Sequence, residues 1–499
     1  MPQIRKILIA NRGEIALRII RTCREMGIAT VAVYSEADRT SPHVLAADEA
    51  LPIGPAPSRE SYLRIDRILE AASASGADAV HPGYGFLSEN PLFAQAVADA
   101  RLVFIGPSAG AIRSMGDKTA ARALAAGAGV PTVPGTPGAV RDGADARDFC
   151  ARHGYPVLVK AAAGGGGKGM RIVRSGSDLE GALRAAASEA RSAFGDERVF
   201  LEKYFEEPRH IEIQILADAR GNAVHLGERE CSIQRRHQKV IEESPSVAVD
   251  EEMRRRMGET ALSVARSCRY LNAGTVEFLV DGEKNFYFLE MNTRLQVEHP
   301  VTELRTGLDL VELQIRVAAG EELPLRQEDV AFRGHAIECR ICAEDPSNNF
   351  LPSTGRIVHL RTPSGPGVRD DRGIDEGGEV SVYYDPMLAK LIAWGPTREG
   401  AIRRLVRALR EYEVLGVKTN ISLCLFVLEH PDFRSGEIST HFLQSHWRPE
   451  PDGDGCAGEE RAAAAVCALI AAGAAPRAAH AASGDSRWKE KRRDFLRGA

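Results

Sequence analysis

Hydrophobic and polar residues alternate along the first hundred residues with two different periods. Short apolar runs, typical of buried strands, are separated by segments whose apolar residues recur at helical spacing, as Ile15, Ile19 and Ile20 do. The pattern predicts strands at 4–10, 30–34, 79–80 and 102–105, and helices at 14–26 and 91–99. Strands that alternate with helices are typical of a parallel α/β sheet, which we expect in this part of the chain.

A nicotinamide-binding Rossmann domain is the obvious alternative for such a sheet. Its fingerprint places three glycines in the turn between the first strand and the first helix. Here that turn reads Ala10-Asn-Arg-Gly-Glu-Ile15 and contains one glycine. The sequence therefore supports the parallel sheet but not an oxidoreductase that binds a dinucleotide.

Changes in local composition divide the rest of the chain. A stretch rich in glycine and proline at 127–138 ends the first pattern, and a strand at 157–160 leads into a second α/β region. Strand and turn signals follow, with a helix at 397–411. The tail contains an acidic linker, an alanine-rich segment at 459–475 and a basic end. We expect structural segments at 1–114, 115–334 and 335–447, and a linker with a tail at 448–499.

The overall composition is that of an ordinary globular protein. The 499 residues are enough for about three domains, and 44% are hydrophobic and 27% charged. A net charge of −5 gives no basic surface for nucleic acid or an anionic membrane. No apolar run resembles a signal peptide or approaches the roughly 20 residues of a membrane span. We therefore expect a cytoplasmic protein that binds neither nucleic acid nor membrane.

The nine cysteines are widely spaced and are expected to be reduced thiols. Cys339 and Cys342 form a C-x-x-C pair, for which a zinc or redox site is one interpretation. The surrounding segment, His335-Ala-Ile-Glu-Cys-Arg-Ile341, has the pattern of a strand. Residues three apart on a strand point to opposite faces, so we expect these sulfurs not to converge.

A glycine-rich loop, Ala163-Gly-Gly-Gly-Gly-Lys-Gly-Met170, follows the strand at 157–160. Consecutive glycines let backbone N–H groups approach phosphate oxygens, and Lys168 adds positive charge. The loop is not a Walker A motif, because glycine follows Lys168 where that motif has serine or threonine. A plain flexible loop is the alternative. Lys160 on the preceding strand favours a lid over a bound nucleotide.

A predicted hairpin brings two carboxylates together. Segments 275–281 and 286–292 alternate like strands, and pairing 281 with 286 places Glu277 opposite Glu290. Two carboxylates at that spacing repel each other unless a cation lies between them, and Mg²⁺ held with nucleotide phosphates is the natural one. The alternative is an exposed pair of solvated carboxylates.

Polar residues continue at alternate positions after this hairpin. If the chain stays extended, Glu290, Asn292, Arg294, Gln296 and Glu298 share one face, until a proline at position 300 ends the strand. Glu298 then has the position of a general base, beside Arg294 as an anion clamp.

A basic run, Arg235-Arg-His-Gln-Lys239, follows a strand-like segment at 228–233. Such runs usually lie on a solvated surface, but this one also suits an anionic substrate. The sequence leaves both interpretations open.

Together these motifs resemble the biotin carboxylases of the ATP-grasp superfamily. The resemblance extends in order from about residue 3 to about 447, and its last motif is very specific. The motifs are Ile7-Leu-Ile-Ala-Asn-Arg-Gly-Glu-Ile-Ala16, His81-Pro-Gly-Tyr-Gly-Phe-Leu-Ser-Glu-Asn90, Met115-Gly-Asp-Lys118, Arg235-Arg-His-Gln-Lys239 and Glu290-Met-Asn-Thr-Arg-Leu-Gln-Val-Glu-His-Pro-Val-Thr-Glu303.

The resemblance implies an α/β and α+β fold in three domains: an N-terminal parallel α/β domain at 1–114, a central ATP-grasp domain at 115–334 and a mixed β/α domain at 335–447. A glycine-rich lid occupies about 133–204. The implied ATP contacts are Lys118, Lys160, Gly166, Gly167, Glu202, Lys203, Tyr204, Phe205, His210, Gln234, His237, Glu277 and Glu290. The implied Mg²⁺ or Mn²⁺ ligands are Glu277, Glu290 and Asn292. Bicarbonate contacts fall on Lys239, Arg294, Gln296 and Val297, the base on Glu298, and biotin contacts on Arg340 and Tyr84, with Arg294, Glu298, Lys239 and Arg340 as the catalytic residues.

The activity implied is the ATP- and bicarbonate-dependent carboxylation of biotin through carboxyphosphate. No Ala-Met-Lys-Met biotinylation sequence occurs, so the chain resembles a stand-alone subunit that works with a biotin carboxyl carrier protein and a carboxyltransferase. The family suggests a homodimer. Acetyl-CoA is the favoured final acceptor, with pyruvate or another acyl-CoA as alternatives. Competing interpretations are another ATP-grasp ligase and an inactive ATP-binding regulatory subunit.

Overall fold

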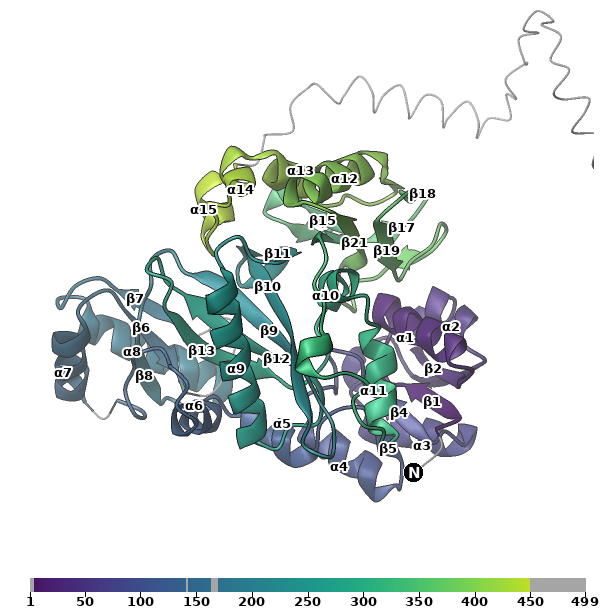
Figure 1. Cartoon of the computed structure of the whole chain (residues 1–499), viewed down its shortest axis with the longest axis horizontal. Coiled ribbons are helices and arrows are strands. Elements are labelled where there is room, and N and C mark those ends of the chain that lie inside the picture. The colour runs from purple at the N-terminus through teal and green to yellow at the C-terminus, as the bar shows by residue number, and fades with distance from the viewer. Residues whose placement is uncertain (1–3, 141, 163–168, 449–499) are drawn as a thin grey trace, which may run out of the picture. The chain divides into compact units, whose positions relative to one another are not determined.

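The computed structural model describes residues 4–140, 142–162 and 169–448 (Figure 1). It confirms the mixed α/β architecture expected from the sequence, with a parallel sheet at the N-terminus and antiparallel sheets after it. The predicted Ala-rich and basic segments of the tail lie outside the described residues, as do Gly166 and Gly167.

The N-terminal part is a five-stranded parallel sheet of order β3-β2-β1-β4-β5. Its elements are β1 (Lys6–Ile9), α1 (Gly13–Glu25), β2 (Ala29–Ser35), α2 (Pro42–Ala46), β3 (Glu49–Gly54), α3 (Ile65–Ser75), β4 (Ala79–His81), α4 (Pro91–Asp99), β5 (Val103–Phe104) and α5 (Ala109–Gly116). The predicted strands and helices are confirmed. The sequence pattern does not reveal β3, an edge strand that contains Pro52 and is only partly buried.

A small antiparallel sheet of order β7-β6-β8 forms the next part. Its elements are α6 (Lys118–Gly127), α7 (Gly143–His153), β6 (Val157–Ala161), β7 (Arg171–Val173), α8 (Leu179–Phe194) and β8 (Val199–Lys203). Helix α8 packs on β6 and β7 around a compact apolar cluster that includes Phe149, Val159 and Leu201. This sheet carries the strand that precedes the glycine-rich run.

An eight-stranded antiparallel sheet forms the centre, in the order β13-β12-β9-β10-β11-β14-β21-β19. Its strands are β9 (Arg209–Ala217), β10 (Ala223–Arg235), β11 (Gln238–Ser244), β12 (Asn272–Val280), β13 (Phe286–Asn292), β14 (His335–Cys342), β19 (Val368–Arg372) and β21 (Met387–Gly395). The helices that accompany it are α9 (Glu251–Ser267), α10 (His299–Thr306) and α11 (Leu310–Ala318). Because β11 pairs with β14, the sheet continues across the boundary expected at 334/335.

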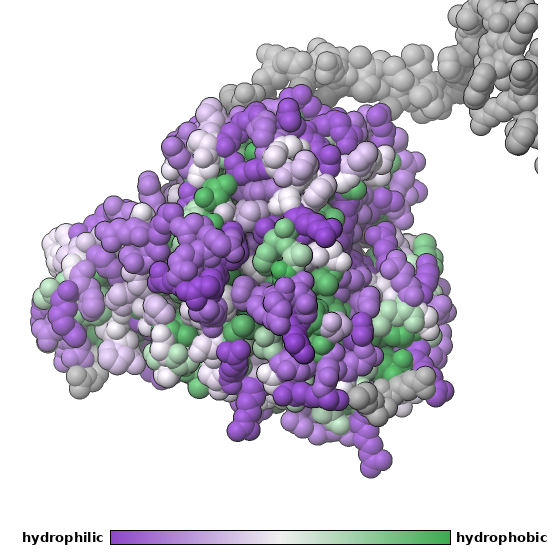
Figure 2. Space-filling model, in the orientation of Figure 1, coloured by the Kyte–Doolittle hydropathy of each residue, from purple (hydrophilic) through white to green (hydrophobic). Residues whose placement is uncertain are grey.

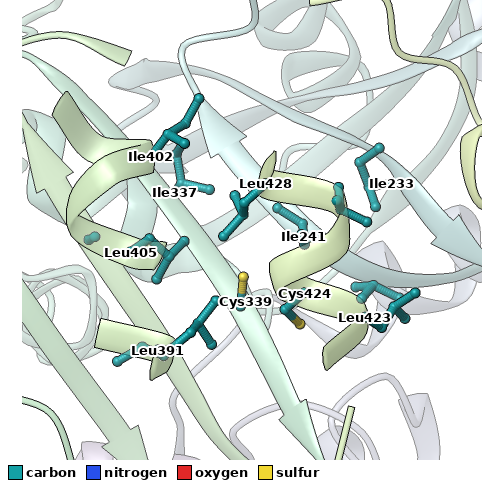
Figure 3. Close-up of a cluster of buried hydrophobic side chains, with 14 of the residues drawn as sticks. Ile233, Ile241, Ile337, Cys339, Leu391, Ile402, Leu405, Leu423, Cys424 and Leu428 are labelled. Atoms are coloured by element: carbon teal, nitrogen blue, oxygen red, sulfur yellow. The ribbon is translucent and has the colours of Figure 1, made fainter. Parts of the chain in front are cut away.

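The C-terminal part adds helices and short strands to this sheet. They are β15 (Glu344–Asp345), β16 (Leu351–Pro352), β17 (Gly355–Arg356), β18 (His359–Arg361), β20 (Glu379–Val380), α12 (Arg398–Glu411), β22 (Glu413–Leu415), α13 (Ile421–Glu429), α14 (Pro431–Ser435) and α15 (Phe442–His446). Figure 3 shows their core, in which Leu405 of α12 and Leu428 of α13 lie over Ile337 and Leu391 of the sheet.

The two cysteines of the C-x-x-C pair are separated by the sheet, as predicted. Cys339 lies in this apolar core beside Cys424, whereas Cys342 lines a cavity elsewhere in the structure. Both are free thiols. They do not form a zinc or disulfide site with each other.

The described residues contain no helix that is both long enough and apolar enough to span a membrane. The face shown in Figure 2 is mostly hydrophilic, and its hydrophobic residues are gathered in separate patches.

Replacing Leu405 by alanine is expected to destabilise the C-terminal core. Leu405 is fully buried, and loss of such a side chain costs about 2–5 kcal/mol through lost burial and a residual cavity. The check is the urea midpoint of the variant against that of Leu351→Ala, a leucine that is 55% exposed. Equal midpoints for the two variants would contradict this account of the core.

Candidate functional site

The two carboxylates of the predicted hairpin face each other across β12 and β13. Glu277 lies opposite Glu290 in the antiparallel register, as predicted. The register assumed for that prediction was wrong next to the loop. Phe286 pairs with Val280, whereas the prediction paired it with Asp281. The loop is therefore longer than predicted, and a register shift between Glu277 and Phe278 compensates for the difference of one residue. The pairing is therefore correct because two errors cancel.

The strand does not continue to residue 298. The prediction that residues 290–298 form one extended segment is therefore wrong. β13 ends at Asn292, the backbone bends at Arg294, and α10 begins at His299 with Pro300 in its first turn. Proline suits the first turn of a helix, where its fixed φ fits and no N–H is needed. The proline therefore starts a helix instead of ending a strand.

Arg294 and Gln296 nevertheless return to the carboxylate pair from this bend. Arg294 donates to Oε1 of Gln296 at 2.8 Å and to Oδ1 of Asn292 at 3.2 Å. Gln296 donates to Oε1 of Glu277 at 3.3 Å. Glu89 of the N-terminal part accepts from Nε of Arg294 at 2.8 Å and holds it in place. The grouping expected from a straight strand is thus produced by a bend.

Lys239 lies at the centre of the buried charges. Its ammonium donates to Glu212 at 2.7 Å, to Glu277 at 3.0 Å and to Glu298 at 2.6 Å. Burial favours the neutral amine and lowers the pKa of Lys239. The three carboxylates outweigh this effect of burial and hold the pKa well above its usual range. Of the two interpretations of the basic run, the anion site fits Lys239, while Arg236 is exposed and bonds Asn349.

Glu298 is fully buried beneath these cations. It accepts from Lys239 and, at 2.9 Å, from Nη2 of Arg340. Burial would raise its pKa, but Lys239, Arg340 and Arg229 outweigh burial and keep the pKa of Glu298 well below its usual range. The carboxylate is therefore ionised at neutral pH.

Arg340 connects Glu298 to a further acid on the neighbouring strand. Its Nε donates to Glu242 of β11 at 2.6 Å. Burial raises the pKa of Glu242 to about 7, against the lowering effect of Arg340. Glu338 lies opposite Glu242 across the two strands, and neither of its buried oxygens has a hydrogen-bond partner. Burial raises the pKa of Glu338 well above its usual range, so it is held as a neutral acid.

A cavity of about 830 Å³ has walls from all four parts of the fold. Lys239 and Arg340 line it, whereas Glu298, which both of them contact, is not part of its wall. The cavity is large enough for a nucleotide together with smaller substrates. The predicted site residues that line it are Tyr84, Lys118, Lys160, His210, Gln234, His237, Lys239, Glu277, Glu290, Asn292, Arg294, Gln296, Val297 and Arg340.

Other predicted residues are not part of the cavity wall. Glu202 accepts from Lys160 at 2.7 Å and from Arg122 at 2.9 Å, so it positions one of the lining lysines. Lys203 donates to backbone carbonyls of residues 154 and 155. Tyr204 bonds the ring of His441, and Phe205 stacks on Tyr287.

Sequence reasoning missed Arg12, which also lines the cavity. It lies in the turn after β1 and makes two bonds to Asp38, at 2.6 and 2.7 Å. Its guanidinium also lies 4.1 Å from the ring centroid of Tyr384. A signal was available, because ligands of parallel α/β sheets lie at the carboxyl ends of the strands.

The donor set around the hairpin fits a hard divalent cation. Glu277, Glu290 and Asn292 offer carboxylate and amide oxygens on adjacent positions of one hairpin. Burial would raise the pKa of Glu277, but Lys239 and His210 outweigh it and lower the pKa, so this ligand stays ionised. Glu290 lies 3.5 Å from the ammonium of Lys118 and is about one-third exposed, which leaves it accessible from the cavity.

Three protein-family models match successive parts of the chain. "Biotin carboxylase, N-terminal domain" matches residues 3–112, "Carbamoyl-phosphate synthase L chain, ATP binding domain" matches 117–326, and "Biotin carboxylase C-terminal domain" matches 338–445.

Curated relatives agree with these matches. A protein named biotin carboxylase from Halalkalibacterium halodurans is 55% identical over 442 residues, covering 89% of this chain and 98% of the relative. The mouse mitochondrial methylcrotonoyl-CoA carboxylase subunit alpha is 52% identical over 444 residues, and the match covers 89% of this chain. The chain spans 62% of the length of that subunit.

Solved structures give the same result. Campylobacter jejuni biotin carboxylase, in a complex with a compound given as beta-gamma-ATP, has a TM-score of 0.85 and 49% identity, covering 89% of this chain and 99% of that one. The biotin carboxylase domain dimer of Hydrogenobacter thermophilus 2-oxoglutarate carboxylase, in complex with MgADP, ADP and bicarbonate, has a TM-score of 0.84 and 48% identity. That match covers 89% of this chain and 98% of the other.

Replacing Lys239 by methionine is expected to destabilise the protein strongly. The change leaves three buried carboxylates without their shared cation, and breaking a buried pair in this way costs about 3–5 kcal/mol. Chemical denaturation of the variant checks this. Lys284→Met is the control, because Lys284 is exposed and its ammonium bonds the exposed Asp250, at 3.3 Å. A Lys239→Met variant as stable as this control would show that the carboxylates are compensated in some other way.

Proposed function

Because the chain belongs to the biotin carboxylase family, a family of ligases, we propose that it carboxylates biotin with ATP and bicarbonate. The products are carboxybiotin, ADP and phosphate. The observation that carries the proposal is the ionised, fully buried Glu298, bonded to Lys239 and Arg340, which line the cavity together with Arg294. One base surrounded by cations suits the deprotonation of an anionic substrate.

In the first step, Glu298 takes the proton of bicarbonate, and the resulting oxygen attacks the γ-phosphorus of ATP. The bond to ADP breaks and carboxyphosphate forms. Lys239 and Arg294 bind the bicarbonate with Gln296 and the backbone of Val297, and their positive charge offsets the charge that builds up during phosphoryl transfer. A Mg²⁺ or Mn²⁺ ion at Glu277, Glu290 and Asn292 would offset further charge on the phosphate oxygens.

In the second step, carboxyphosphate breaks down to CO₂ and phosphate. The phosphate removes the proton of the biotin ureido nitrogen, which then attacks CO₂. Arg340 stabilises the negative charge on the ureido oxygen, and Tyr84, the other proposed biotin contact, also lines the cavity. Glu242 holds the arginine through its Nε, leaving the other side of the guanidinium fork near Glu298.

The nucleotide occupies the remaining cavity, between the sheet β7-β6-β8 and the central sheet. Lys118, Lys160, His210, Gln234 and His237 line this part and supply charge and hydrogen bonds. The segment from Glu202 to Phe205 borders it. The glycine-rich loop, predicted from the sequence to be a lid over the nucleotide, lies largely outside the described residues.

The proposed partners follow from the reaction. Biotin reaches the cavity on a biotin carboxyl carrier protein, and a carboxyltransferase passes the carboxyl group to its acceptor. We propose a cytoplasmic homodimer, since one structural relative is described as a biotin carboxylase domain dimer. Acetyl-CoA is the favoured acceptor, with pyruvate or another acyl-CoA as alternatives, while the relatives are named for methylcrotonoyl-CoA, propionyl-CoA, pyruvate and 2-oxoglutarate. Carboxylation of biotin is the step that serves all of them.

Replacing Glu298 by glutamine is expected to abolish turnover while preserving ATP binding. Loss of a general base costs typically 10²–10⁴-fold in rate, whereas the amide keeps the size of the side chain. Bicarbonate-dependent ADP release, with and without free biotin, gives the rate, and calorimetry gives the ATP affinity. The exposed Glu376→Gln serves as the control. Turnover that survives in Glu298→Gln would refute the assignment of the base, and wild-type ADP release that biotin never stimulates would refute the function.

Glu242 is expected to impose a pH dependence on biotin use. Its pKa of about 7 means that it is protonated at lower pH, where it holds Arg340 less strongly and leaves the arginine to Glu298. kcat/KM for biotin should therefore rise as the pH increases through about 7. The Glu242→Gln variant should lose this step, and an unchanged profile in that variant would assign the step to another group.

A further inference from the structure

A second group of metal-ligand side chains lies away from the substrate cavity, where α13, α14 and α15 meet. Nε2 of His446 lies 3.4 Å from Oδ2 of Asp432, and Nδ1 of His430 lies 3.9 Å from the same oxygen. One ligand atom from each of these residues lies within 4.8 Å of the other two. All three are partly exposed, and none of them lines the substrate cavity.

The two imidazoles are fixed by the aromatic residues around them. The ring of His430 packs 5.4 Å from Phe426 and 5.2 Å from Phe442, and the ring of His446 lies 4.8 Å from Phe442. The two histidine rings are themselves 4.5 Å apart. Side chains held in this way lose little conformational freedom when they bind a ligand, which favours binding.

The spacing of the donor atoms is close to that of a transition-metal site. Zn²⁺ binds His nitrogen and Asp oxygen at about 2.0–2.2 Å, so neighbouring ligand atoms of a tetrahedral site lie about 3.3 Å apart. The separation between His446 and Asp432 already has this value, and the one between His430 and Asp432 is about half an ångström longer. A small side-chain rotation is enough to close the site.

The nitrogen of His430 nearest Asp432 is a hydrogen-bond acceptor. Its Nδ1 accepts a long bond, of 3.2 Å, from the backbone N–H of Asp432 at the start of α14. An accepting Nδ1 has a lone pair in place of a proton. A metal ion at the cluster would take this lone pair and replace the bond from the backbone N–H.

We propose that His430, Asp432 and His446 bind one divalent transition-metal ion, with Zn²⁺ as the first candidate and water completing the coordination. Two imidazoles and one carboxylate suit zinc-like ions, whereas Mg²⁺ prefers oxygen ligands, so this site differs in chemistry from the hairpin at Glu277 and Glu290.

The ion would tie α15 to α14. The position of α15 matters for the substrate cavity, because His441 at the start of this helix bonds the hydroxyl of Tyr204 at 3.1 Å. Tyr204 is one of the residues expected to border the nucleotide. Metal binding at α15 therefore restrains a contact of the nucleotide-binding part.

The test is Zn²⁺ binding by the full chain after removal of metal with a chelator. Competition with a chromogenic chelator gives the stoichiometry and affinity, and thermal unfolding with and without Zn²⁺ gives an independent readout. We compare wild type with His446→Gln and with His430→Asn, which keeps a side-chain acceptor at the start of α14. Each variant should lose one equivalent of Zn²⁺ and the corresponding thermal shift. The loss in affinity should exceed the roughly 10- to 100-fold that removal of an outer hydrogen bond to a metal ligand costs.

His359→Gln is the matched control. His359 is a partly exposed histidine with two carboxylates, Glu376 at 3.0 Å and Glu413 at 3.5 Å, and it has no second histidine beside it among the described residues. This variant should bind Zn²⁺ as wild type does. The proposal is overturned if His446→Gln and His430→Asn retain the wild-type stoichiometry and affinity, or if His359→Gln loses the equivalent instead. Displacement of Zn²⁺ from wild type by Mg²⁺ at equal concentration would also overturn it.

Discussion

The sharing of one ammonium group by three buried carboxylates is the interaction on which the site depends. Glu212, Glu277 and Glu298 are all within 3.0 Å of Lys239, whose charge offsets part of the cost of burying them. Arg229 and Arg340 supply further positive charge, and Arg229 is itself fully buried against Glu212. The result is a base that remains ionised although it is inaccessible to solvent.

The order of the strands makes this sharing possible. Glu212 lies on β9, Arg229 on β10, Lys239 on β11 and Glu277 on β12, which are consecutive in space. Their register places Glu212 beside both Glu277 and Arg229. The stretch after β13 then brings Glu298 to the same point from a bend and the start of a helix. Backbone hydrogen bonds between the strands thus fix the distances between these charged side chains.

Much of this arrangement was predictable from the sequence, in part from the periodicity of the residues and in part from family resemblance. Alternation and helical spacing identified the parallel sheet and the Glu277–Glu290 pair. They failed beyond Asn292, because the same polar alternation fits a bend as well as a strand, and Pro300 suits a helix start as well as a strand end. Arg12 was missed although it directly follows the carboxyl end of β1. Glu89 was missed because its contact with Arg294 joins parts far apart in the chain. No local pattern records such contacts. The roles of Lys239 and Arg340 came from family resemblance rather than from spacing.

The continuous eight-stranded sheet has a consequence for dividing this protein into pieces. A cut at 334/335 would separate β14 from β11 and expose backbone N–H and C=O groups that the pairing of Ile241 with Cys339 and of Glu243 with Ile337 now covers. An uncovered strand edge of this kind is a template for aggregation. The same cut would take Arg340 away from Glu242 and Glu298 and leave both acids in an opened core. Although family models divide the chain near this position, the physical unit of folding extends across it.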